Sequence, residues 1–184
     1  MGDMRLQGVH LDSGNPTTYN EATATAFAAG NLGKIFSISG NTDNVDSGLQ
    51  PKTFQIVKLA STAQTSAIGQ VVVWSDVDAM TVNNTYTIGN AARNSGAGVL
   101  NNASLTAGNY VCIQIGGNAL VLMETTQTVA AGDVVIVGAA TQGKGEVVAG
   151  GTAPTHIPLG VAKTAKNSGS ATTVEVLLFP PRVY

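Results

Sequence analysis

Charged side chains are scarce in this chain. They make up 11% of its 184 residues, against roughly a quarter in ordinary soluble domains. Acid–base catalysis and metal binding both need clusters of ionisable side chains, and with two histidines the sequence offers little material for one. A surface of neutral groups costs little to desolvate and is typical of proteins that other chains cover. The composition therefore favours an assembly protein over an enzyme, and predicts no cofactor.

Positive charge is equally sparse. Nine Lys and Arg residues stand against eleven Asp and Glu, which gives a formal net charge of −2. Nucleic-acid binding depends on a basic patch that neutralises phosphates. The sequence has no such run, so we expect no direct nucleic-acid partner.

Cysteine occurs once, which excludes an intrachain disulfide and a zinc cluster built on cysteines. Strand alternation places Cys112 on the face opposite Val111 and Ile113. We interpret it as a small packed side chain; a reactive thiol is the alternative.

Long apolar runs are also missing. No stretch approaches the ~20 residues of a membrane span, and the N-terminal residues lack the apolar core of a signal peptide. The sequence therefore predicts no membrane partner and synthesis in a cytoplasm without export.

What the chain does contain is turn and strand material, with 22 glycines and many Val and Thr residues. Short candidate strands lie between turn signals at intervals of about eight to twelve residues, a spacing typical of a β-sandwich or barrel. They are residues 34–39, 53–59, 70–74, 85–88, 98–100, 109–115, 119–123, 133–137, 145–148, 157–162 and 172–178. The pair Gly116-Gly117 predicts a hairpin between two of them.

Weak repeats recur within this pattern. Residues 67–72, 106–111 and 130–135 each contain small residues, a glycine, a polar residue and then a strand. Glycine permits the positive φ that such a turn can require. A second repeat relates residues 98–100 to 160–162. These repeats are explained either by hairpin chemistry alone or by a duplicated half-barrel.

Three motifs suggest chemistry but favour plainer interpretations. Residues 138–145 nearly spell a phosphate-binding loop, yet Gly145 replaces the required Ser or Thr and a strand follows, so we expect a β-hairpin. Asp76 and Asp78 share a strand face without a third ligand, which indicates a solvated strand end. His10 and His156 lack the context of a catalytic triad and are expected at the surface.

Several segments together resemble the capsid decoration (cement, or auxiliary capsid) proteins of tailed bacteriophages. The resemblance covers residues 34–179. It rests on residues 69–76 (GQVVVWSD), 96–100, 106–114, 116–121, 131–133, 159–162 and 174–178.

The resemblance implies an all-β fold, a compact β-barrel or β-tulip-like domain, with no catalytic residues. It implies a virion protein on the outer capsid that binds the major capsid protein and itself, as a homotrimer, and cements neighbouring capsid subunits around the DNA. The alternative is a head-fibre or receptor- or glycan-binding module on the virion surface. An enzyme, such as a glycan hydrolase, is a third and weaker hypothesis.

We divide the chain into an N-terminal arm, residues 1–33, and a barrel domain, residues 34–184. The arm is polar, with thinly spread apolar residues, and is expected to become ordered on binding. The side chains expected to anchor it on the capsid are Leu6, Val9, Leu11, Tyr19 and Phe27.

Overall fold

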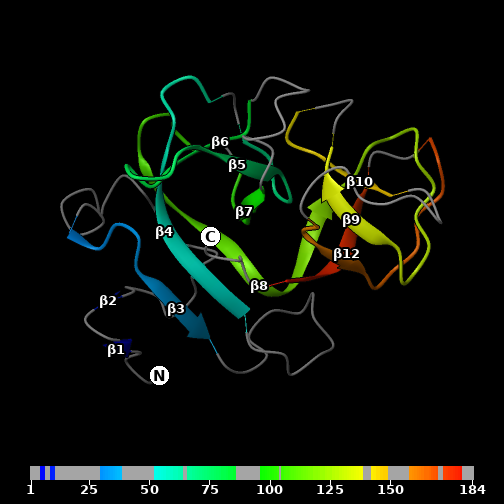
Figure 1. Cartoon of the computed structure of the whole chain (residues 1–184), viewed down its shortest axis with the longest axis horizontal. Coiled ribbons are helices and arrows are strands. Elements are labelled where there is room, and N and C mark those ends of the chain that lie inside the picture. Colours follow the sequence, from blue (N-terminus) through cyan, green and yellow to red (C-terminus); the bar gives the residue numbers. More distant parts are fainter. Residues whose placement is uncertain are drawn as a thin grey trace.

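The computed structural model describes residues 5–6, 9–10, 30–38, 52–63, 66–85, 96–103, 105–138, 142–148, 158–169 and 172–179. The all-β prediction is confirmed (Figure 1). The strands are β1 (Arg5–Leu6), β2 (Val9–His10), β3 (Ile35–Ile38), β4 (Lys52–Leu59), β5 (Val71–Asp76), β6 (Thr81–Asn83), β7 (Gly96–Leu100), β8 (Tyr110–Leu122), β9 (Val134–Val137), β10 (Gly145–Val147), β11 (Gly160–Ala162) and β12 (Thr173–Leu178). β1 and β2 form a separate antiparallel pair. The other ten strands form one sheet.

The middle of the chain closes into a five-stranded mixed barrel. Its order is β4, β6, β5, β7 and the first half of β8, and the pairing of β8 with β4 closes the ring. The ring is mixed because β4 and β6 run parallel, while its other pairs are antiparallel. β3 adds to the free part of the β4 edge.

The prediction of a hairpin at Gly116-Gly117 is wrong. β8 continues through both glycines as a single strand of 13 residues. Gly116 pairs with Thr53 of β4, whereas Gly117, at φ 77°, already pairs with Leu178 of β12. The glycines therefore carry the strand from one set of partners to another, instead of reversing it.

The second half of β8 belongs to a second ring. Its order is β8, β10, β9, β11 and β12, visible on the right of Figure 1, and β12 pairs back with β8. The parallel contact of this ring is a bridge between Met123 and Gly145. Glu124 N–H donates to Gly145 O at 2.9 Å beside it.

The second ring repeats the first, roughly 63 residues later. In the first ring Val72 pairs with Gly98, and in the second Val135 pairs with Gly160. The parallel contact recurs too, since Leu59 pairs with Val82 where Met123 bridges Gly145. Of the two explanations for the sequence repeats, the register supports duplication, and the repeated unit is a whole five-stranded ring that shares β8.

The three glycine turns have one geometry. Gly69, Gly108 and Gly132 have φ values of 84°, 85° and 97°. Each glycine N–H donates, at 2.8 to 2.9 Å, to the last residue of the strand beside it, as in the bond from Gly69 to Leu100 O. That residue donates back to the residue after the glycine, so that Leu100 N–H bonds Gln70 O at 2.8 Å. Each turn therefore sets the register of the strand that follows.

The cores of the two rings also correspond. Nine buried residues fill the first ring: Val57, Leu59, Val72, Val82, Ala97, Leu100, Val111, Ile113 and Ile115. Their counterparts in the second ring are Val121, Met123, Val135, Gly145, Leu159, Ala162, Val174, Val176 and Leu178, and all nine are buried. Alternation thus points the same set of positions inward twice.

The rings differ at their parallel contact. In the first ring Lys58 N–H donates directly to Met80 O at 2.9 Å. In the second, Leu122 N–H donates to Gly69 O at 2.7 Å, and Val71 N–H donates to Gly143 O at 2.9 Å. The turn that opens β5 is therefore inserted into the wall of the second ring, and the two rings form one body.

Two expectations about strands need correction. Thr81–Asn83 forms β6, which the sequence analysis missed. The strand expected at residues 85–88 is not formed at Thr85, and its other residues lie outside the described part. Thr85 N–H instead donates to Asn83 Oδ1 at 2.9 Å, an Asx turn that ends β6.

Candidate interaction surface

Leu177 and Phe179 place large apolar side chains on the outside of the second ring. Along β12 the residues alternate, so that Val174, Val176 and Leu178 are buried in the core. Leu177 is 39% exposed and Phe179 is 45% exposed. Exposed apolar residues that are neighbours on one face are a feature of binding surfaces.

Half-buried apolar side chains border this pair. Val161 of β11 lies directly opposite Leu177, and Leu120 of β8 lies opposite Glu175. Residues paired in this way point to the same face of a sheet. We call the face formed by Leu120, Val161, Leu177 and Phe179 the β12 patch.

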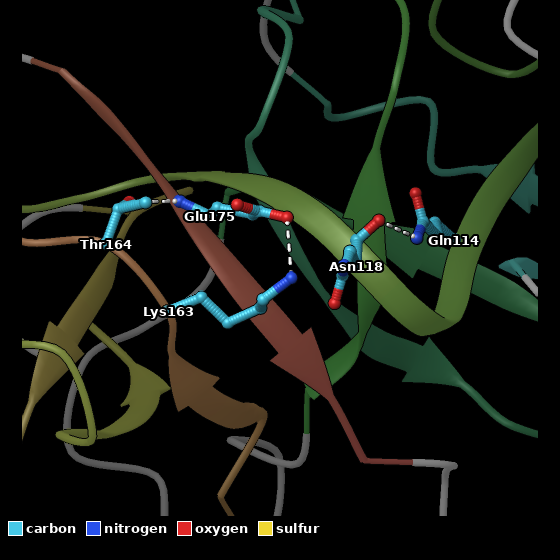
Figure 2. A network of polar contacts seen from close by, with 5 residues as sticks. All are labelled: Gln114, Asn118, Lys163, Thr164 and Glu175. Carbon is cyan, nitrogen blue, oxygen red and sulfur yellow. Dashed lines mark hydrogen bonds and ion pairs between the residues drawn. The ribbon is translucent and has the colours of Figure 1, made fainter. Parts of the chain in front are cut away.

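Two charged residues beside the β12 patch, Lys163 and Glu175, form an ion pair. Lys163 Nζ lies 3.0 Å from Glu175 Oε1, and Glu175 N–H donates to Thr164 Oγ1 at 3.0 Å (Figure 2). With side chains 38% and 19% exposed, the ion pair adds little stability, up to about 1 kcal/mol. Its effect on the surface is to leave the β12 patch without net charge.

The position of the first ring that corresponds to Leu177 lies where β8 crosses between the rings. It is occupied by a buried glutamine, Gln114. Gln114 is 1% exposed, and its Nε2 donates to Gly116 O at 3.1 Å. The same Nε2 donates to Asn118 O at 2.7 Å (Figure 2). Asn101 Nδ2 donates to its Oε1 at 3.1 Å. Buried polar groups require such bonds. Gln114 therefore holds the crossing of β8 and is not part of a binding site.

Of the sequence-predicted anchors, the structure describes only the backbone of two. Leu6 and Val9 are paired with each other in β1 and β2. Leu11, Tyr19 and Phe27 lie outside the described residues, so their role in capsid binding stays a prediction. At the predicted arm boundary, Gly33 N–H donates to Ile56 O at 2.8 Å, which joins this turn to β4.

The residues considered for chemistry occupy structural positions. Burial raises the pKa of the Cys112 thiol to about 12, because the thiolate would be desolvated. This agrees with a packed, unreactive cysteine. Asp76 accepts from Ala79 N–H at 2.9 Å and caps the β5–β6 turn. The phosphate-loop-like segment joins the antiparallel strands β9 and β10, so the predicted hairpin is confirmed.

A buried lysine, Lys166, forms hydrogen bonds that stabilise the fold. Lys166 is 6% exposed, and its Nζ donates to Glu124 O and Gln127 O, both at 2.8 Å. It thereby satisfies two carbonyls of the segment after β8. Within the described ranges, no group of three or more His, Cys, Asp or Glu side chains is placed to bind a metal. The same residues contain no helix long and apolar enough to cross a membrane. His10 lies in β2, and His156 is outside the described residues.

The β12 patch was not predicted from the sequence. The signal was the run Val176-Leu177-Leu178-Phe179, in which consecutive apolar residues cannot all face one core. Without the partner strands, alternation alone does not tell which of them points outward.

Comparison with known proteins gives limited similarity. Neither a family model nor a curated protein matches the chain. Among solved structures, the chain is similar to the N-terminal base of the head fibre protein gp8.5 of bacteriophage phi29. The two are 11% identical, the match covers 71% of this chain and 98% of that chain, and the TM-score is 0.46. A likeness of this degree establishes neither a common fold nor a common function.

Proposed function

We propose that the protein is a structural component of the outer surface of a phage head. The observation that carries this proposal is the β12 patch, an apolar face on the outside of the second ring. Such a face suits protein–protein contact, because it loses little solvation on burial and gains about 25 cal/mol for each Å² of apolar area. The sequence resemblance to capsid decoration proteins supplies the kind of partner, the major capsid protein.

Within this class we favour the cement role. A protein that binds the mature lattice of capsid subunits stabilises that lattice by mass action. Each copy contributes little, but every junction between capsomers carries a copy. The homotrimer and the anchoring arm, residues 1–33, belong to this proposal.

The second candidate is a head-fibre base that holds a receptor-binding module. The solved structure described above bears such a name, so the description of that similar protein agrees with this role more than with the cement role. The two roles differ in what the virion loses without the protein.

Virions assembled with and without this chain test the proposal. In the cement role, particles without it release DNA at a lower temperature and after milder osmotic shock. If these particles are equally robust but no longer adsorb to cells, the head-fibre role replaces the cement role. If purified protein does not bind the stripped heads at all, both roles are wrong.

The arm is tested separately by deleting residues 1–30. This deletion ends before the turn at Gly33, whose bond to β4 is part of the fold. We expect an unchanged circular dichroism spectrum and reduced occupancy on heads. Unchanged occupancy would exclude the arm as an anchor.

A further inference from the structure

The outer face of the first ring carries apolar side chains that belong to neither ring core. Val57 and Leu59 point into the first ring, so Phe54 and Ile56, which alternate with them on β4, point outward. Phe36 of β3 lies opposite Phe54, and their aromatic rings stack with centroids 5.7 Å apart. In the described part of the chain, neither ring core includes these three side chains. We call Phe36, Phe54 and Ile56 the β4 outer cluster.

The β4 outer cluster is almost completely buried. Phe36 is 5% exposed, Phe54 is 1% exposed and Ile56 is 0% exposed. Among the described strands, those in extensive contact with β4 are β3, β6 and β8, which lie beside it in the sheet. Strands of one sheet do not cover its face, because side chains stand roughly perpendicular to the sheet. Another part of the chain therefore lies over the cluster.

The turn before β3 is fixed beside Ile56. Gly33 N–H donates to Ile56 O at 2.8 Å, and Ile56 N–H donates to Lys34 O at 3.1 Å. Gln55 Nε2 also donates to Gly33 O, at 3.3 Å. The segment that the structure describes here starts at Gly30, so the preceding chain arrives at the Ile56 end of β4, where burial is deepest.

We propose that residues 11–29 pack over the β4 outer cluster of the same chain, with Phe27 beside Ile56. Phe27 is six residues from Gly33, and a chain of this length spans at most about 20 Å, which keeps it near β4. The other residues of 22–29 are Ala and Thr, which allow a close approach to an apolar face. The inference concerns the protein before it meets a partner, so it goes beyond the proposed function and does not rest on it.

Charge supports this choice of segment. Three lysines lie on the outer face of β3 and β4, by alternation with the cluster: Lys34, Lys52 and Lys58. The two strands contain no acidic residue. Residues 11–29 carry two charges, Asp12 and Glu21, and both are negative. Residues 180–184 carry only Arg182, which would bring a like charge to this face.

Residues 39–51 are the other acidic segment near this face, but their position fits the cluster less well. They join Ile38 to Lys52, which are paired at the end of β4 far from Ile56. Their large apolar residues are one Val and one Leu, against Leu, Tyr and Phe in residues 11–29. Coverage by residues 39–51 or 180–184 is an outcome that the experiment distinguishes.

The inference divides the arm into two parts. Residues 11–29 are held on the barrel, and the β1–β2 pair is the part that stays available to a head. Of the five expected anchors, Leu6 and Val9 then keep this role. Leu11, Tyr19 and Phe27 belong to the segment that contacts the barrel.

Cys112 reports on the cover, because it lies opposite Ile56 on β8. In the unchanged protein at pH 8, a maleimide should label it slowly. Phe27→Asp in the full chain places a carboxylate against an apolar face and should raise the labelling rate about 100-fold, since the cover opens while the barrels stay folded. Phe27→Ala only removes the contact and should raise the rate about tenfold.

Val9→Asp is the matched control, because it places the same charge in β2, and it should leave the labelling rate unchanged. Leu49→Asp and Tyr184→Asp test the other two segments in the same way. Circular dichroism checks that each variant keeps its strands, and Phe27→Ala decides the question if Phe27→Asp does not fold. Slow labelling in the folded Phe27 variants, or fast labelling in any of the other three variants, overturns the inference.

Binding to stripped heads separates this inference from the proposed function. If Phe27→Asp exposes Cys112 and still binds heads fully, Phe27 contacts the barrel and is not an anchor on the capsid. If this variant keeps Cys112 covered but no longer binds heads, Phe27 contacts the capsid, and the inference is wrong while the proposed function stands.

Discussion

The first and second rings have nearly the same strand register and the same inward-facing positions. They differ in one respect: a turn of the first ring is inserted into the wall of the second ring. The turn at Gly69 enters the wall of the second ring, where Gly69 O accepts from Leu122 N–H and the following Val71 N–H donates to Gly143 O. The equivalent turn at Gly132 is exposed. The two turns have the same backbone geometry but different roles. The turn at Gly132 only sets the register of its own ring, whereas the turn at Gly69 also joins the two rings. Changes made at equivalent positions can separate these roles.

The largest difference in free energy of unfolding is expected between Gly69→Ala and Gly132→Ala. Both residues have positive φ, which strains alanine by about 1 kcal/mol. At Gly69 a Cβ would also lie 2.9 Å from Leu122 N and 3.0 Å from Leu120 O, whereas at Gly132 it would meet nothing within 4 Å. We expect a loss of about 4 kcal/mol for Gly69→Ala and about 1 kcal/mol for Gly132→Ala in urea unfolding. Equal losses would show that the inserted turn does not join the rings.

Leu59→Ala and Met123→Ala remove equivalent, fully buried side chains. Each should lower the free energy of unfolding by about 2–5 kcal/mol through lost burial and a cavity. Because Val71, Val73 and Val99 of the first ring seal the core of the second, both variants should unfold in a single transition. Two separate calorimetric peaks in either variant would contradict the view that the rings are one body.

Met80 and Gly143 occupy equivalent places, and both have positive φ, at 49° and 74°. Gly143→Ala should cost about 1–2 kcal/mol, because alanine is strained there and its Cβ would come within 3.2 Å of Gln70 Nε2. Met80→Gly relieves strain but frees the unfolded chain, so stability should stay within about 1 kcal/mol of the unchanged protein. Thermal denaturation of the two variants checks this difference. A larger loss for Met80→Gly would reverse it.

Cys112 of the first ring occupies the position that Glu175 occupies in the second. Its contribution to the free energy of unfolding changes with pH in the alkaline range. The folded pKa of about 12 exceeds the ordinary value of 9.0, so the unfolded chain loses this proton first. The stability that comes from the neutral thiol is present below pH 9 and is lost as pH rises from about 9 to 12. In the matched variant Cys112→Ala, that part of the pH dependence should vanish from urea unfolding curves. At pH 8 a thiol reagent should label the unchanged protein only in denaturant, and rapid labelling of the folded protein would contradict the burial.

Local chemistry made part of this architecture predictable. The glycine turns at 69, 108 and 132 were recognised with their positive φ, since glycine adopts that conformation more readily than any other residue type. The strands after them follow, because β-branched residues begin within three residues of each glycine. What could not be predicted is where a strand finds its partners. Gly116-Gly117 fits a hairpin as well as a crossing, and only the distant strands β4 and β12 decide between them.

The candidate surface was less predictable than the fold. Leu177 and Leu178 are identical in type, yet one is exposed and the other is 5% exposed. Their difference depends on the register of β12 with β8, a long-range property. β6 escaped notice because it is three residues long and ends in Asn. It pairs with β5 across a short turn and with β4 in parallel.

The sharing of β8 has a mechanical consequence. The strand runs through both rings, hydrogen-bonded to β4 and β7 in its first half and to β12 in its second. A pull along its axis loads these ladders in shear, so that many bonds must break together and not one after another. Under such a load the two rings would extend together, because β8 continues from one to the other as a single unbroken strand.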